Sequence, residues 1–267
     1  MKIPDFKTKK ELFAFLIEEK ETLIADKMAA VKHADGMAYK DGAIYGQATK
    51  AFTQTVKALG DDGTLTVTAI INTTNLMDSH KDVHLPGIWN KSIKENKSIM
   101  HLQEHQMQFD KIIAKGKDLK VSAKTFTWKE LGFNFSGSTE ALTFESTVRD
   151  DRNKQMFDLY RKGEVDNHSV GMRYVKLILA VNDEEYGAEY DAWEKYYPEI
   201  ANKAEADAVG YFWAVKEAKV IEGSAVPLGS NYATPTLDIK EPGQPTPKPE
   251  PSKDTQKKQT FINLLKS

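Results

Sequence analysis

Apolar and polar residues begin to alternate with a period of two near residue 63, and this pattern dominates the middle of the chain. In "TLTVTAII", Leu65, Val67, Ala69 and Ile71 alternate with threonines, and "DLKVSAKTF" and "ALTFESTV" repeat the pattern. Successive side chains of a β-strand point to opposite faces, so this period is typical of strands with one buried face. "HSVGMRYVKLILAV" and "GYFWAVKEAKVIEGSAV" are two further predicted strands. The alternation therefore predicts a β-rich core.

A helix is predicted over residues 8–33, ahead of this core. Thr8 and Glu11 match a capping box, in which the two side chains satisfy backbone N–H groups at the start of a helix. An apolar stripe follows at helical spacing, formed by Phe13, Ile17, Ile24, Met28 and Val31. Two interpretations remain open. The helix either packs on its own domain or docks on a partner, since Lys and Glu crowd its other faces.

Two further segments favour helices. "DRNKQMFDLYRKG" predicts a short helix with Phe157 and Tyr160 on one side. Residues 183–207 are acidic and helical in composition, and they contain Trp193 and Tyr197 as anchors. We interpret residues 183–207 as an insertion between two strands of the β-rich core.

The last residues have a different composition. "KEPGQPTPKPEPSKDTQKKQ" is rich in Pro, Lys and Gln, which is typical of a disordered linker, and it leads to the short apolar peptide "TFINLLKS". Such a tip is either a docking motif or a frayed end. We therefore expect a helical N-terminal arm (1–57), a β-rich domain (58–240) and a linker with an apolar terminal peptide (241–267).

Composition excludes several classes of function. The 267-residue chain has 40% hydrophobic and 28% charged residues and a net charge of −2, which gives no reason to expect nucleic acid or an anionic membrane as partner. The absence of cysteine excludes disulfides, thiolate catalysis and cysteine-ligated zinc. "MKIPDFKTKK" lacks the apolar stretch of a signal peptide. We expect the protein to be made and kept in a cytosol, or in something assembled there.

The histidines raise the question of a metal site. "HLQEH", from His101 to His105, fits the H-x-x-E-H pattern of some zinc peptidases, and "DSHKDVH" (78–84) offers further ligands. The pattern needs a helix, however, and this stretch lies between a turn and the predicted strand "KIIAKG". On a strand, His101 and His105 would stand ~13 Å apart, too far to share one zinc ion. A zinc-dependent hydrolase stays an alternative.

Ser169 is the candidate nucleophile. It lies in "DNHSVG" at the start of an apolar strand, and the small Gly171 two positions later is expected to let a substrate backbone approach closely. No G-x-S-x-G sequence is present, which argues against an α/β-hydrolase. The residues alone indicate a β-rich domain with the character of a hydrolase.

Three blocks of sequence resemble the prohead proteases of tailed phages, which are capsid-maturation serine peptidases. "MDSHKDVHLPGIWNKSIKENKSIMHLQEHQMQFDKIIAKG" looks like the opening of that family, which leads to a strand ending in a catalytic histidine. "QMFDLYRKGEVDNHSVGMRYVK" looks like its helix and nucleophile strand, and "VKEAKVIEGSAVPLGSNYATPTL" is similar to its closing strand. The blocks have the family's order and cover roughly residues 64–237.

The resemblance implies three catalytic residues. His105 matches the catalytic histidine, Ser169 matches the nucleophile, and Glu222 is the candidate third member, with Asp82 or Asp110 as substitutes. His101 is then a bystander. The order histidine, serine, third member is that of the related herpesvirus assembly proteases. It implies a mainly β (α+β) fold with flanking helices, built on a closed or partly closed β-barrel of the assemblin type.

The resemblance also implies a biological setting. The family's enzymes work inside the immature phage shell, which assembles in the host cytoplasm. They cleave scaffolding protein, the arm of the major capsid protein, and often themselves. No cofactor is expected, and a homo-oligomer is compatible with the resemblance. A protein that kept this fold without activity, as a scaffold, is the second alternative.

Overall fold

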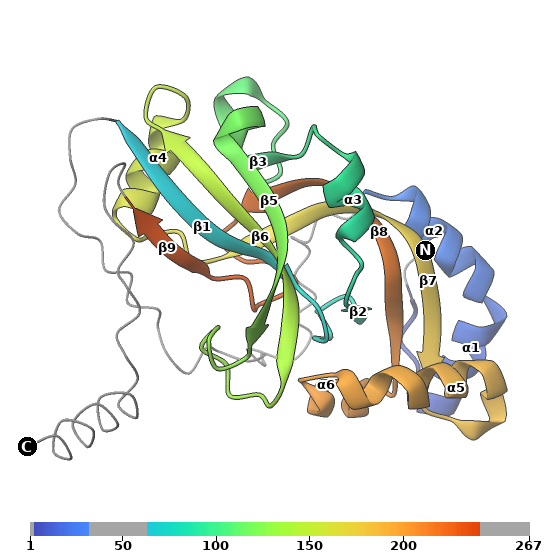
Figure 1. Cartoon of the computed structure of the whole chain (residues 1–267). Helices are drawn as coiled ribbons and strands as arrows, with labels where there is room; N and C mark the ends of the chain where they lie inside the picture. Colours follow the sequence, from blue (N-terminus) through green and yellow to red (C-terminus); the bar gives the residue numbers. More distant parts are fainter. Residues whose placement is uncertain (1–2, 32–62, 241–267) are drawn as a thin grey trace, which may run out of the picture.

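The computed structural model describes residues 3–31 and 63–240, and these form a mixed α+β fold of two β-sheets with helices around them (Figure 1). The strands are β1 (Thr64–Thr73), β2 (Asp82–His84), β3 (Met100–Gln103), β4 (Ile112–Lys115), β5 (Leu119–Thr127), β6 (Ser138–Arg149), β7 (His168–Val181), β8 (Tyr211–Ala225) and β9 (Thr236–Lys240). The α-helices are α1 (Lys9–Glu18), α2 (Lys20–Ala29), α3 (Asn90–Glu95), α4 (Lys154–Arg161), α5 (Gly187–Tyr196) and α6 (Lys203–Val209).

The first sheet has four strands in the order β5-β6-β1-β9, and the pairs are antiparallel. The second sheet has five strands and is built around β8. One edge of β8 pairs along its length with the antiparallel strand β7, and the other edge pairs with the parallel strands β2 and β3. The antiparallel strand β4 then pairs with β3. The long strand β8 thus pairs with three other strands, β2, β3 and β7, from separate parts of the sequence.

The resemblance implied a closed or partly closed β-barrel, and a closed barrel is not formed. The short 3₁₀ turn Gly116–Asp118 carries the chain from β4 in one sheet to β5 in the other, and no ladder joins the two sheets within residues 63–240. The sheets instead share a core. The sheets approach each other closely at Gly223, because a Cβ there would lie 2.6 Å from the Phe144 ring and 2.7 Å from the Ile71 side chain. The prediction of an α+β fold is confirmed, whereas the closed barrel is wrong.

In the first half of β1, buried and partly exposed residues alternate as predicted. Leu65, Val67 and Ala69 are buried, and the threonines between them are partly exposed. From Ile70 onward every residue is buried, because a second apolar cluster around Trp128 covers the other face of the strand. The period of two therefore holds only where one face meets solvent.

The predicted helix over residues 8–33 is two helices, α1 and α2, separated at Glu19. The capping box of Thr8 and Glu11 is present. The break changes which side chains face inward: Phe13, Leu16 and Leu23 are buried in the main core, whereas Met28 is exposed. Helix α2 lies beside β7, and α1 packs against α2 (Figure 1). They pack on their own domain.

The segment between β7 and β8 is helical, as predicted for residues 183–207. It contains α5 and α6 with two short 3₁₀ turns. Trp193 is buried and stacks on Tyr197 and against Phe212 of β8.

The helix predicted in "DRNKQMFDLYRKG" is α4, and its buried face includes Phe157 and Tyr160. The linker and apolar tip (241–267) lie outside the described residues. No helix of the described part is long and apolar enough to cross a membrane.

Candidate catalytic site

Glu222 lies near the end of β8, fully buried, with Met100 of β3 on one side and Gly171 of β7 on the other. A Cβ at Gly171 would lie 1.8 Å from Glu222 Oε1, so the carboxylate occupies the space that a side chain would fill. This corrects the sequence interpretation of Gly171. The glycine makes room for a carboxylate of the neighbouring strand, not for a substrate backbone.

His105 follows β3 directly and holds its ring against this carboxylate. Its Nδ1–H donates to Glu222 Oε1 at 2.5 Å. The backbone of Glu104 and His105 is left-handed, with φ of 50° and 57°. Side chains with a Cβ rarely adopt this conformation, and such strain, of order 1–3 kcal/mol per residue, is concentrated at functional sites. The reversal brings the ring back over the end of the strand that precedes it.

Hydrogen bonds hold this reversal in place. The Glu104 N–H donates to the Ala225 carbonyl at 2.9 Å, and the His105 N–H donates to Ser224 Oγ at 3.1 Å. Ser224 Oγ in turn donates to Glu222 Oε2 at 2.6 Å. Both oxygens of the buried carboxylate therefore have a donor, which is the condition for a stable buried charge.

Ser169 lies on β7 directly opposite Ser224 of β8. Directly opposed residues of an antiparallel pair share a face of the sheet, and so do residues two apart on one strand. Ser169, Gly171, Glu222 and Ser224 therefore share one face, the face over which the His105 ring lies. The hydroxyl oxygen of Ser169 is buried and has no hydrogen-bond partner among the described residues. An orphaned buried hydroxyl is uncommon in a folded protein, so that of Ser169 calls for an explanation.

The whole site is nearly closed to solvent. Ser169 is 2% exposed, and the His105 side chain is 4% exposed. In such surroundings an ionic hydrogen bond is stronger than in water, because the effective dielectric constant is low. The His105–Glu222 contact is therefore electrostatically strong.

His101 lies on the opposite face of the second sheet. It pairs with Gly223, whose own face meets the other sheet. Ser146 Oγ lies 2.9 Å from His101 Nδ1, and the Tyr160 hydroxyl lies 3.3 Å from His101 Nε2. The sheet thus separates His101 from His105. The two histidines therefore cannot chelate one ion, but the reason differs from the predicted one, because the left-handed turn after β3 places them on opposite faces instead of along one face of a strand.

A second buried histidine joins His101. Tyr160 Oη lies 3.0 Å from His168 Nε2, and His168 Nδ1–H donates to the Thr234 carbonyl at 3.0 Å. Burial lowers the pKa of His168 to about 4 and lowers the pKa of His101 well below its ordinary value. Both rings are therefore neutral near pH 7 and serve as hydrogen-bonding parts of the core.

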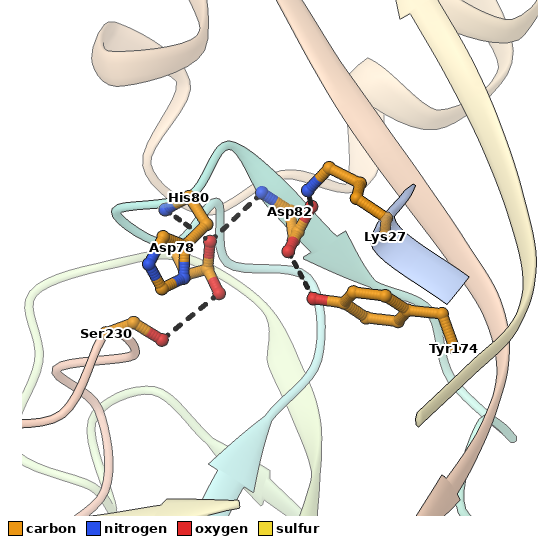
Figure 2. A network of polar contacts seen from close by, with 6 residues as sticks. All are labelled: Lys27, Asp78, His80, Asp82, Tyr174 and Ser230. Carbon is orange, nitrogen blue, oxygen red and sulfur yellow. Dashed lines mark hydrogen bonds and ion pairs between the residues drawn. The ribbon is translucent and has the colours of Figure 1, made fainter. Parts of the chain in front are cut away.

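The acidic segment 78–84 forms a network of its own (Figure 2). Asp82 accepts from Lys27 Nζ of α2 at 2.7 Å and from the Tyr174 hydroxyl. Asp78 accepts from the backbone N–H groups of His80 and Asp82 at 2.8 and 3.0 Å, and from the Ser230 hydroxyl at 3.3 Å. The carboxylates here secure a loop and a helix to the sheet.

This network bears on two earlier alternatives. Asp82 is committed to Lys27 and Tyr174, and Asp110 lies in an exposed 3₁₀ turn, so the structure brings neither into the place of Glu222. Within residues 3–31 and 63–240, the group with the spacing of metal ligands is Asp78, His80 and Asp82, and it includes neither His101 nor His105.

An apolar groove runs along the same face beside the site. Its walls include Met100 and Leu102, which pair with Glu222 and Ser224, and it continues through Met107 and Phe109, two and four residues after His105. The groove has a volume of about 190 Å³, and Phe109 is 91% exposed. The groove adjoins the strands that carry the site, but its lining includes none of Ser169, His105 and Glu222.

Ser224 is a member of the candidate site that sequence reasoning missed. The signal was present in "EGS", because residues two apart on a strand share a face and a serine is able to bond a carboxylate in that position. The pattern alone did not reveal the third partner, the backbone N–H of His105, because that contact depends on the left-handed turn after β3.

The fold and site define a class: an α+β protein with a serine, a histidine and a carboxylate on one face of a sheet. Comparison with protein-family models, with curated proteins and with solved structures found no match for this chain.

Proposed function

We propose that this protein is a serine endopeptidase with Ser169 as nucleophile, His105 as general base and Glu222 as the residue that orients the histidine. The observation that carries the proposal is the bond from His105 Nδ1–H to Glu222 Oε1 on the face that also holds Ser169. Because Nδ1 carries the proton, Nε2 of a neutral ring has the lone pair that a base requires.

The chemistry follows from these roles. Ser169 Oγ attacks the carbonyl carbon of the scissile peptide bond, and its proton passes to His105 Nε2. The imidazolium, stabilised by Glu222, gives that proton to the leaving amine, and an acyl-enzyme ester remains on Ser169. A water molecule, deprotonated by the same nitrogen, hydrolyses the ester and restores the serine.

The resemblance to the tailed-phage prohead proteases supplies the setting in this proposal. The substrates are then scaffolding protein, the arm of the major capsid protein and the chain itself, and the place is the interior of the procapsid. A core related to that of the herpesvirus assembly proteases is part of the same proposal. The near-complete burial of Ser169 supports an enzyme that is carried into the shell in a weakly active form.

The test is capsid maturation with matched serine variants. Ser169→Ala should leave the fold intact and abolish cleavage of scaffold and of the protein itself when it is co-expressed with the capsid and scaffolding proteins of its phage. Ser138→Ala, at an exposed position on β6, is the control and should process normally. Normal processing by Ser169→Ala would favour an inactive protease-fold scaffold. Loss of processing in the presence of a chelator would favour a zinc-dependent hydrolase.

A further inference from the structure

Ser224 forms hydrogen bonds to both His105 and Glu222. Its Oγ accepts the backbone N–H of His105 at 3.1 Å and donates to Glu222 Oε2 at 2.6 Å. The residue is fully buried, and its two neighbours in register are Ser169 on β7 and Leu102 on β3. One hydroxyl thus fixes both the backbone of the histidine and the carboxylate of the glutamate.

We propose that Ser224 is a positioning residue for the His105–Glu222 pair; this inference rests on the proposed peptidase function. Glu222 has two equivalent oxygens and a rotatable carboxylate, and His105 lies on a left-handed backbone that residues with a Cβ rarely adopt. The Ser224 hydroxyl removes both freedoms at once. It leaves Oε1 as the oxygen that faces the ring, and it keeps the left-handed residue anchored to β8.

The same contacts separate the roles of the two opposed serines. Ser224 uses its proton on a carboxylate and its lone pair on a backbone N–H, so it has no free proton for His105 to remove. Ser169 Oγ has no hydrogen-bond partner in the described parts of the chain. Ser224 therefore orients the base, and Ser169 is the group available for attack.

Ser224→Ala should misplace the ring without loss of the fold. The variant leaves Glu222 Oε2 without a donor and the His105 N–H without an acceptor. A displacement near 1 Å at a catalytic group costs up to about 10²-fold in rate, so we expect a fall of roughly 10- to 100-fold. With a fluorophosphonate probe, the maximal rate of labelling of Ser169 should fall by that factor, and the half-saturating probe concentration should stay the same. Ser224→Thr keeps the hydroxyl and should restore most of the rate.

A measurement on the histidine itself distinguishes positioning from a general loss of structure. Proton NMR of the His105 Nδ1–H, assigned by its absence in His105→Ala, reports the bond to Glu222 directly. Ser146→Ala is the matched control. Ser146 of β6 is also a buried serine bonded to a histidine, but its partner is His101, on the other face of the second sheet.

We expect the His105 Nδ1–H signal to shift or disappear in Ser224→Ala and to stay in place in Ser146→Ala. An unchanged signal in Ser224→Ala would overturn the proposal, whatever happens to the labelling rate. Absence of any peptidase activity in the wild-type protein, with the signal still dependent on Ser224, would contradict the proposed function and leave the positioning role supported.

Discussion

Gly171 of β7 and Glu222 of β8 are directly opposed, and the Glu222 carboxylate occupies the space that a side chain at position 171 would fill. The gap of 1.8 Å between Glu222 Oε1 and a Cβ at position 171 is far shorter than any van der Waals contact. The absence of a side chain at position 171 therefore leaves the space that the Glu222 carboxylate occupies.

Gly171→Ala should displace Glu222 and with it His105. We expect a loss of activity of at least about 10²-fold, because the new methyl group occupies the position of the carboxylate. The measurement is a double-mutant cycle with Glu222→Ala, which empties the space. In the Glu222→Ala background, Gly171→Ala should cause little further loss of activity. Equal losses in both backgrounds would show that the two residues act independently.

Glu222→Gln keeps the shape of the side chain and removes its charge. Activity should fall by roughly 10²–10⁴-fold, because the imidazolium that forms on His105 loses its counter-charge and the ring loses its fixed tautomer. Rates of cleavage or of probe labelling measure the effect. Glu217→Gln, on the same strand but partly exposed and paired with Lys91, is the control and should retain activity. Retention of activity by Glu222→Gln would remove Glu222 from the catalytic group.

Substitutions of the two histidines of "HLQEH" should have different effects on activity. His105→Ala is expected to be as damaging as Ser169→Ala, since members of a catalytic triad act as a unit. His101→Ala removes two buried hydrogen bonds and should lower the free energy of unfolding by roughly 1–3 kcal/mol. It should spare activity at temperatures where the variant is folded. Equal loss of activity from both, with zinc in the purified protein, would revive the metal hypothesis.

Stability should fall as the pH is lowered toward 4. The unfolded state takes up protons on histidine below about pH 6.5, whereas His168 stays neutral in the fold until about pH 4. The stabilisation is therefore complete above pH 6.5 and is lost progressively below it, by up to about 1.4 kcal/mol per pH unit for this residue. Urea unfolding of the Ser169→Ala variant between pH 7.5 and 4.5 measures the slope. In His168→Gln the slope should be shallower, and an unchanged slope would refute this cause.

Lys27 anchors the N-terminal helices to the sheet. Its Nζ lies 2.7 Å from the fully buried Asp82 carboxylate and over the rings of Tyr174 and Trp213. Lys27→Met leaves Asp82 without its counter-charge, so the free energy of unfolding should fall by about 3 kcal/mol. The double variant Lys27→Met/Asp82→Asn should recover part of the loss. Lys10→Met, which removes an exposed pair with Glu185, should change stability by less than about 1 kcal/mol.

The sequence predicted the elements of the fold well where the local pattern decides them. Alternation located the long strands, and the capping box of Thr8 and Glu11 located the first helix. The break at Glu19 was missed, because the sequence there contains no glycine or proline and the interruption depends on how α1 packs against α2 and α2 packs against β7.

The closed barrel was the main error of fold. Whether two sheet edges meet depends on long-range geometry, and the turn at Gly116–Asp118 gave no local sign that β4 and β5 belong to different sheets. The site shows the same limit. Ser169, Glu222 and Gly171 were recognisable as residue types at strand positions, but their common face follows from the register of β7 on β8, which no local pattern specifies.

The most direct test of the central claim is to identify the residue that reacts with a fluorophosphonate probe. Wild-type protein, Ser169→Ala and His105→Ala would each be treated with the probe, digested and analysed by mass spectrometry. We predict one modified peptide in the wild type, with the modification on Ser169. We predict no labelling of Ser169→Ala and at least about 10²-fold slower labelling of His105→Ala. Modification of another serine such as Ser224, or equal rates for the wild type and His105→Ala, would contradict the account.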